Sequence, residues 1–123
     1  MEFLLKYMTY KEVLETILKI DDKIRFCTIT DMHGNISDSG HHHHTQNLLT
    51  YIQSEMLLKL AVQSWIKRNL YEDEIGAGEY ALAVYKKIKR ITLRLNDDHL
   101  VYLTTERDTD HDRIISEIQK ISI

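Results

Sequence analysis

Two segments near the C-terminal end place the strongest constraint on the fold of this 123-residue chain. Residues 89–95 (KRITLRL) alternate apolar and polar side chains, and residues 99–106 (HLVYLTTE) are rich in β-branched and aromatic residues. Alternation with a period of two is the pattern of a β-strand. The three residues between them, Asn96-Asp97-Asp98, form a typical turn sequence. We therefore predict an antiparallel pair, with residues 80–86 (YALAVYK) as a third strand before it.

A second hairpin is predicted in the first half of the chain. Residues 23–30 (KIRFCTIT) have the β-branched and aromatic character of a strand, and residues 36–39 form a short return strand. Between them, Asp31-Met32-His33-Gly34-Asn35 is a turn in which Gly34 supplies a positive φ angle. Residues 40–44 (GHHHH) then follow as a polar loop.

Helices are predicted at both ends. Apolar residues recur from Tyr10 to Leu18 at helical spacing, and Thr9 and Glu12 before and within that stripe form a capping box. The last helix begins in the acidic segment 108–112, with Thr109 as its N-cap. Its apolar face consists of Ile114, Ile115, Ile118 and Ile121.

The middle helix is predicted to span residues 45–70, although two shorter helices would also fit the pattern. Its apolar arc is nearly twice the roughly 100° that one contact with a sheet requires. Leu48, Ile52, Met56, Leu60 and Ile66 lie on one side of the arc, and Tyr51, Leu58, Val62 and Trp65 continue it around a flank. The excess predicts a second contact. We assign a homodimer interface to Tyr51, Leu58, Val62 and Trp65 on the helix and Tyr80, Leu82 and Val84 on the third strand.

The element order is therefore α-β-β-α-β-β-β-α. It predicts an α/β (α+β) fold, in which three helices cover a five-stranded antiparallel sheet, and a single domain over residues 1–123. A lone cysteine, no secretory signal pattern and no long apolar run indicate a cytoplasmic protein without a membrane span.

Four consecutive histidines, His41 to His44, are the most unusual feature of the composition. Imidazole binds zinc, copper and nickel, and alternate residues of an extended segment share a side. The residues at which we expect a divalent transition metal are His41 and His43, with His33 (or Asp38) as a further ligand. The alternative is a solvated polar loop that binds metal only adventitiously.

The remaining candidates have weaker patterns. Asp108, Asp110, His111 and Asp112 are better explained as acids at a helix start than as a cation site. Cys27 has no neighbouring base and is expected to be buried and inert. No phosphate-binding, hydrolase or metalloprotease motif is present. We therefore expect no enzyme and no cofactor, unless the histidine loop binds a divalent transition metal.

The only basic concentration lies at residues 86–94. Arg90 and Arg94 share one face of the predicted fourth strand and are candidates for contact with an acidic partner. The alternative is that charges on a sheet face or edge deter aggregation. The formal net charge of −3 does not favour nucleic acid.

The order of elements and the turn at residues 31–35 resemble the roadblock/LC7 group of profilin-like folds. Residues 24–34, residues 78–95 and the strand 99–106 with Asp110-His111 are also similar to a family of small uncharacterised archaeal proteins. The resemblance covers residues 9–121. It implies an antiparallel sheet with the middle helix on one face and the terminal helices on the other. It also implies a dimeric, non-catalytic module that scaffolds or regulates signalling complexes.

Together these observations lead to one main expectation and one alternative. We expect a protein-interaction or regulatory module that forms a homodimer and binds a further protein, with no membrane partner. The alternative is a small metal- or ligand-responsive sensor that uses the loop His41 to His44.

Overall fold

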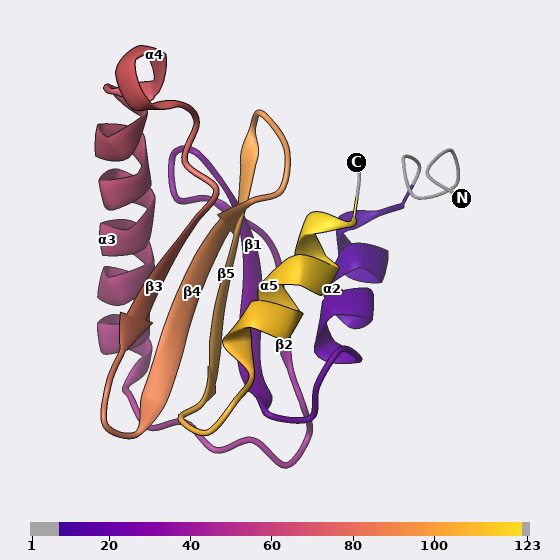
Figure 1. Ribbon diagram of the computed structural model, residues 1–123. Coiled ribbons are helices and arrows are strands. Elements are labelled where there is room, and N and C mark those ends of the chain that lie inside the picture. Colours follow the sequence, from indigo (N-terminus) through magenta and orange to yellow (C-terminus); the bar gives the residue numbers. More distant parts are fainter. Residues whose placement is uncertain (1–7, 122–123) are drawn as a thin grey trace.

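The computed structural model describes residues 8–121 and shows a three-layer arrangement around one sheet (Figure 1). Helices α2 and α5 lie on one face of the sheet, and of the helices in the described residues α3 covers the other face, as the family resemblance implies. The helices are α2 (Tyr10–Leu18), α3 (Tyr51–Asn69), α4 (Glu72–Ile75) and α5 (His111–Gln119). The strands are β1 (Ile24–Asp31), β2 (Ile36–His41), β3 (Tyr80–Val84), β4 (Ile88–Arg94) and β5 (His99–Glu106).

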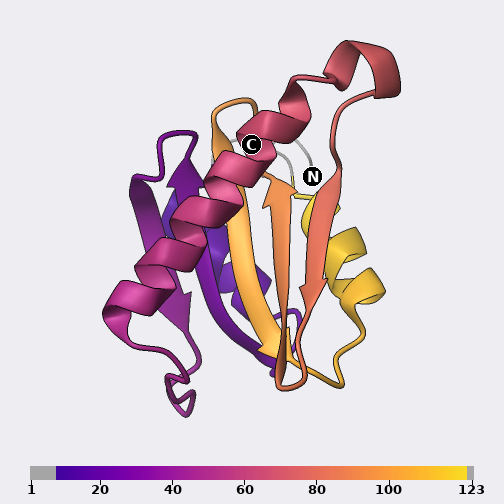
Figure 2. The same ribbon diagram turned by 90° about the vertical axis from the view of Figure 1, so that its left-hand side faces the viewer.

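The five strands are antiparallel and lie in the order β2-β1-β5-β4-β3. The predicted class and strand number are therefore confirmed. The last strand, β5, sits in the middle and pairs with β1 from Ile24 opposite Thr105 to Asp31 opposite His99. Helix α3 crosses the sheet diagonally, from β2 toward β3 (Figure 2).

The first hairpin turns as predicted. Gly34 has a φ angle of +85°, which other residues adopt only with strain. The Asp31 carboxylate accepts hydrogen bonds from the backbone N–H groups of His33 and Asn35, at 2.8 and 2.9 Å. The return strand is longer than predicted, because Gly40 and His41 belong to β2. A Cβ atom at Gly40 would lie 3.0 Å from Leu14 Cδ2, so glycine lets this strand end run close under α2.

The N-caps of α2, α3 and α5 determine where these helices begin. The capping box of Thr9 and Glu12 is confirmed at the start of α2. Helix α3 begins six residues later than predicted, because a second capping box, formed by Thr50 and Gln53, starts it at Tyr51. Residues 45–50, including Leu48, are therefore outside the helix. The N-cap of α5 is Asp110 and not Thr109, whose buried hydroxyl donates instead to the Glu106 carbonyl.

The described chain contains four helices and not three. The additional helix, α4, is a single turn at Glu72–Ile75, within a segment predicted to be a loop. None of the helices in residues 8–121 is long and apolar enough to cross a membrane.

The core is unequally divided between the two faces. The larger cluster lies between the sheet and the pair α2 and α5, and it includes Ile17, Ile29, Leu103 and Ile114. The smaller cluster, beneath α3, contains only Val62, Trp65 and Leu100 as buried members, with Met32 and Ala81 packed against it. The C-terminal half of α3 therefore supplies most of its apolar contact with the sheet.

Candidate functional site

The predicted orientation of α3 is wrong for three of the proposed interface residues. Leu58, Val62 and Trp65 face the sheet of their own chain, and Trp65 is only 1% exposed. They are not available to a second subunit. Helical spacing shows which residues share a side of a helix, but not which side meets the sheet.

The outward side of α3 instead carries large apolar residues. Met56 is 65% exposed, and the same side includes Ile52, Leu60 and the nearby Leu70. Tyr51, which was predicted to belong to the interface, is 81% exposed. Single exposed apolar residues are common, but a group on one helix face is typical of a binding surface. We call Ile52, Met56 and Leu60 the outer stripe.

The strand β3 provides a second open feature. It forms one edge of the sheet and pairs only with β4 among the described strands. Its sequence, YALAV, contains no charged residue, whereas edge strands are usually protected by charge, proline or a bulge. Tyr80 and Val84 are exposed, while Leu82 packs against the larger core cluster. The backbone of β3 is therefore available for pairing.

The histidine run does not form the predicted three-ligand arrangement. His33 lies in the turn before β2, and His41 ends the same strand, so the length of β2 separates them. The rings of His42 and His44 are stacked with centroids 5.7 Å apart. In residues 8–121 no group of three or more histidine, cysteine or acidic side chains is placed to hold a metal ion. Metal binding through His41 and His43 stays a prediction, without His33.

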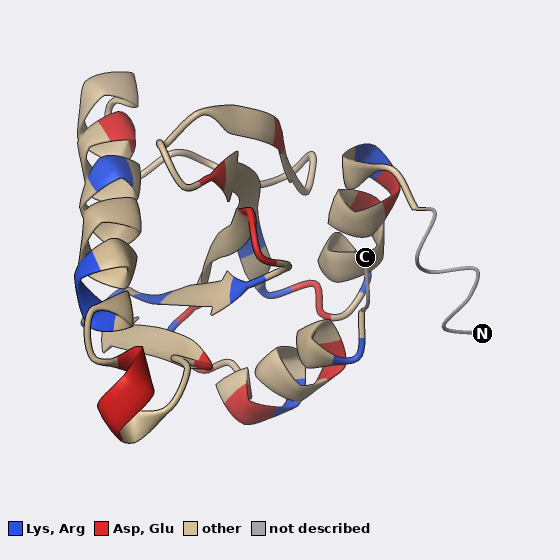
Figure 3. Cartoon of the chain, turned by 90° about the horizontal axis from the view of Figure 1, so that it is seen from above, with Lys and Arg blue, Asp and Glu red and all other residues tan. Residues whose placement is uncertain are grey.

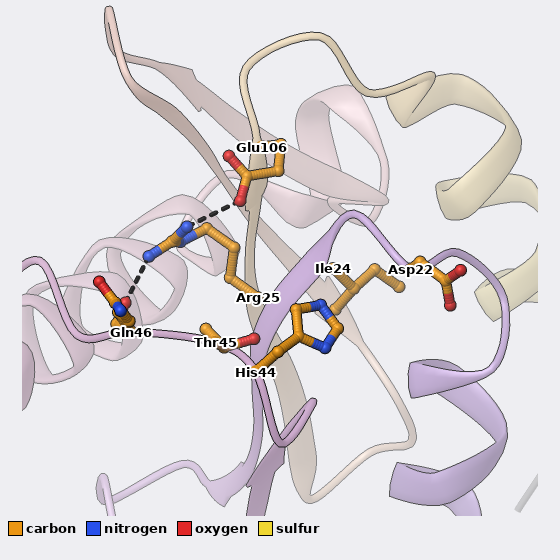
Figure 4. Close-up of a pocket in the computed structure, with 7 residues that line it drawn as sticks. All are labelled: Asp22, Ile24, Arg25, His44, Thr45, Gln46 and Glu106. Carbon is orange, nitrogen blue, oxygen red and sulfur yellow. Dashed lines mark hydrogen bonds and ion pairs between the residues drawn. The ribbon is translucent and has the colours of Figure 1, made fainter.

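A polar hollow of about 220 Å³ adjoins the end of the histidine run (Figure 4). Arg25 crosses it, donating to Glu106 Oε1 at 2.7 Å and to the Gln46 carbonyl at 2.6 Å. His44 and Asp22 also line the hollow. Arg25 and Glu106 pair with each other, and Arg25 also holds the segment after the histidines against the sheet through the Gln46 carbonyl.

The two predicted partner-binding arginines are not a surface patch. Arg90 is 8% exposed because α3 covers this face of the sheet. It donates to the Tyr102 hydroxyl at 2.8 Å, the Tyr85 hydroxyl at 2.9 Å and the Leu57 carbonyl at 3.1 Å. Arg94, half-buried, contacts Glu72 at 3.8 Å. Arg90 is therefore a buried anchor for α3, and Arg94 links the sheet to α4.

Basic and acidic residues are interspersed along the chain (Figure 3). The acidic residues of α4 lie beside the last turn of α3, which carries Lys67 and Arg68. Asp108 pairs with Lys23 at 3.1 Å, and this hydrogen bond lowers the pKa of the carboxyl below its usual value. Asp110 caps α5. These partners agree with the interpretation of the acidic cluster as a helix start.

Cys27 lies in the middle of β1 and is completely buried. Burial in an apolar environment strongly raises the pKa of its thiol, because the thiolate would be poorly solvated. This agrees with the expected inert cysteine.

Comparison with solved structures identifies the fold. The gliding protein MglB from Thermus thermophilus superposes with a TM-score of 0.72 at 12% identity, over 89% of this chain and 79% of that chain. A roadblock/LC7 domain from Streptomyces avermitilis gives 0.70 at 7% identity, over 89% and 88%. MglC from Myxococcus xanthus gives 0.61 at 11% identity, over 91% and 92%. The described chain has the roadblock/LC7 fold.

The sequence itself matches no family model, and no curated protein matches it. The similarity to an archaeal family therefore stays a prediction. At these identities the structural likeness establishes the fold alone, so the functional assignment depends on the surfaces described above.

Proposed function

We propose that this protein is a non-catalytic interaction or regulatory module that acts as a homodimer and binds a further protein. One observation carries the proposal: an apolar, uncharged edge strand, β3, lies in the same molecule as an exposed apolar stripe on α3. An unpaired strand edge and an exposed apolar stripe are both energetically unfavourable in water. Contact with another protein pairs the strand and buries the stripe.

A second copy of the chain fits the edge strand. Two antiparallel β3 strands related by a twofold axis present the same residues to each other, as a closed dimer requires. Their pairing would extend the sheet across both subunits and place the two α3 helices on one common face. Tyr80, Leu82 and Val84 would lie at this junction. On α3 we now assign the contact to the outer stripe of Ile52, Met56 and Leu60, because the residues first assigned to it face the sheet.

The further protein partner would bind where the dimer presents its helices. One solved neighbour, MglB, is described in a tetrameric arrangement, at 12% identity and a TM-score of 0.69. That arrangement belongs to MglB, and it supports the proposal only by showing that a protein with this fold assembles with itself. The absence of a recognisable catalytic motif in the sequence agrees with a non-catalytic role.

Sedimentation equilibrium at micromolar concentration tests the dimer. We expect a species of twice the monomer mass for the wild type, and monomers for the variants Leu60→Glu and Val84→Lys. A charge in the outer stripe or at the strand edge would have to be desolvated in the interface. Ser116→Glu, an exposed change on α5 across the sheet, is the matched control and should remain dimeric.

The two variants separate the parts of the proposal. A monomeric wild type would overturn the homodimer. If the wild type is dimeric and Val84→Lys does not weaken it, pairing through β3 is wrong. If Leu60→Glu does not weaken it, the outer stripe is not part of the homodimer contact.

A further inference from the structure

A cavity of about 340 Å³ lies between the N-terminal half of α3 and the sheet. It exists because the helix packs on the sheet mainly through its C-terminal half, while residues 45–50 and the first two turns of the helix form a roof. Its size is near the lower end of the roughly 300–1,000 Å³ range of small-molecule sites. The walls are predominantly apolar, and their apolar members include Phe26, Ile36, Leu48, Leu49, Leu58 and Ile88.

The charged side chains of the lining are paired, Arg25 with Glu106 and Lys59 with Glu55. Two hydroxyl-bearing residues of β5, Thr104 and Tyr102, also line the cavity. The Thr104 hydroxyl oxygen is buried and has no hydrogen-bond partner within residues 8–121. Tyr102 accepts a hydrogen bond from Arg90 Nε at 2.8 Å, which leaves its own hydroxyl hydrogen free to be donated. A ligand that brings acceptors would satisfy both hydroxyls, and the Thr104 oxygen, which is covered in this structure, would have to turn toward it.

The charge behind these donors is positive. Arg90 lies behind Tyr102 and, in the described part of the chain, forms no salt bridge with a carboxylate. Its partners are two tyrosine hydroxyls and one carbonyl. A buried cation is favoured by a nearby anion, and it polarises the hydroxyl to which it donates. Burial raises the pKa of Tyr102, so the phenol stays protonated and remains a donor at neutral pH.

We propose that this cavity binds a small amphiphilic carboxylate of the fatty-acid type. The carboxylate accepts hydrogen bonds from the Thr104 and Tyr102 hydroxyls, within the field of Arg90. The alkyl chain lies against the apolar walls beneath α3. This site is on the face that α3 covers near β1 and β2, and its occupancy does not depend on the proposed dimer.

Isothermal titration of the full chain with octanoate tests the site, with 1-octanol as the ligand of matched chain length. We expect one octanoate per chain and binding at least about tenfold weaker for 1-octanol, because hydrogen bonds to a charged acceptor are stronger than those to a neutral one. Equal affinity for the two ligands would overturn the assignment of a carboxylate. No octanoate binding up to millimolar concentration would overturn the site itself.

Two pairs of variants locate the binding. Thr104→Val removes one donor with little change in shape and should weaken octanoate binding about tenfold, whereas Thr16→Val on α2 should not change it. Ser54→Trp fills the cavity from the helix and should abolish binding. Ser64→Trp, on the same helix but outside the cavity lining, should leave binding intact.

Circular dichroism and thermal unfolding establish that each variant is folded before it is titrated. A folded Ser54→Trp that binds octanoate as well as the wild type would place the ligand elsewhere and overturn the proposal. The same conclusion would follow if folded Thr104→Val and Thr16→Val bound octanoate equally well. The stoichiometry is counted per chain, so a failure of dimerisation would not affect the result.

Discussion

At the scale of single residues, Arg90 shows how far a side chain can differ from its expected role. Strand alternation correctly placed it on one face with Thr92 and Arg94, and that pattern suggested a basic surface. The structure covers this face with α3, so the guanidinium joins three separate parts of the chain: Leu57 in α3, Tyr85 after β3 and Tyr102 in β5. An anchor of this kind matters because the apolar cluster beneath α3 is small.

We predict that Arg90→Met lowers the free energy of unfolding by roughly 1–3 kcal/mol, because it leaves the Leu57 carbonyl and two tyrosine hydroxyls without their donor. Urea denaturation followed by circular dichroism measures this change. Arg107→Met, an exposed substitution, is the control and should change stability by less than about 0.5 kcal/mol. Equal effects of the two substitutions would contradict the anchoring role of Arg90.

At the scale of elements, the hairpin between β1 and β2 depends on one carboxylate. The backbone N–H of Asn35 is the main cause that lowers the pKa of Asp31, and the Asn35 side chain and the His33 backbone N–H add to it. A carboxyl group whose pKa is lower in the folded state stabilises the fold above its unfolded pKa of about 4. This contribution is lost as the pH falls through the folded pKa.

The difference in unfolding free energy between the wild type and Asp31→Asn should therefore depend on pH. We expect the wild type to be more stable at pH 6 to 7, and the difference to shrink as the pH falls below about 4. Urea denaturation of both proteins across this range measures it. A difference that stays constant with pH would show that the ionised form of Asp31 is not what the turn requires.

Local patterns predicted the elements better than they predicted their environment. Gly34, the Thr9 capping box and the alternation in residues 89–95 are encoded within a few residues, and each is observed. The start of α3 was missed because Thr45 and Thr50 are both acceptable N-caps, and only Thr50 is followed by Gln53 at the capping-box position.

The candidate sites depended on contacts between distant segments, which no local pattern reports. Helical spacing grouped Leu58, Val62 and Trp65 correctly, but it could not show that the sheet covers them. The separation of His33 from His41 follows from the length of β2, which was underestimated by two residues. The cavity beneath α3 had no sequence signal, because its lining comes from residues spread between positions 25 and 104.

At the scale of the whole molecule, stability and assembly should be linked. If two copies pair through β3 and the outer stripe, unfolding is coupled to dissociation of the dimer. The melting temperature then rises with protein concentration. We predict such a rise for the wild type between micromolar and hundred-micromolar concentrations, and none for Leu60→Glu. Scanning calorimetry at several concentrations measures it. A wild-type melting temperature that does not depend on concentration would contradict a dimer that stabilises the fold.

The position of β5 at the centre of the sheet has a consequence for how the chain acquires its structure. The pairs formed by residues 24 and 105 and by residues 31 and 99 join the two halves of the sheet across most of the sequence. While the chain is being synthesised, β1 and β2 can form only a two-stranded hairpin with α2 packed against it, which leaves the β1 edge that pairs with β5 unpaired. The sheet closes after β5 has left the ribosome, so the fold forms late and its apolar strands need protection until then.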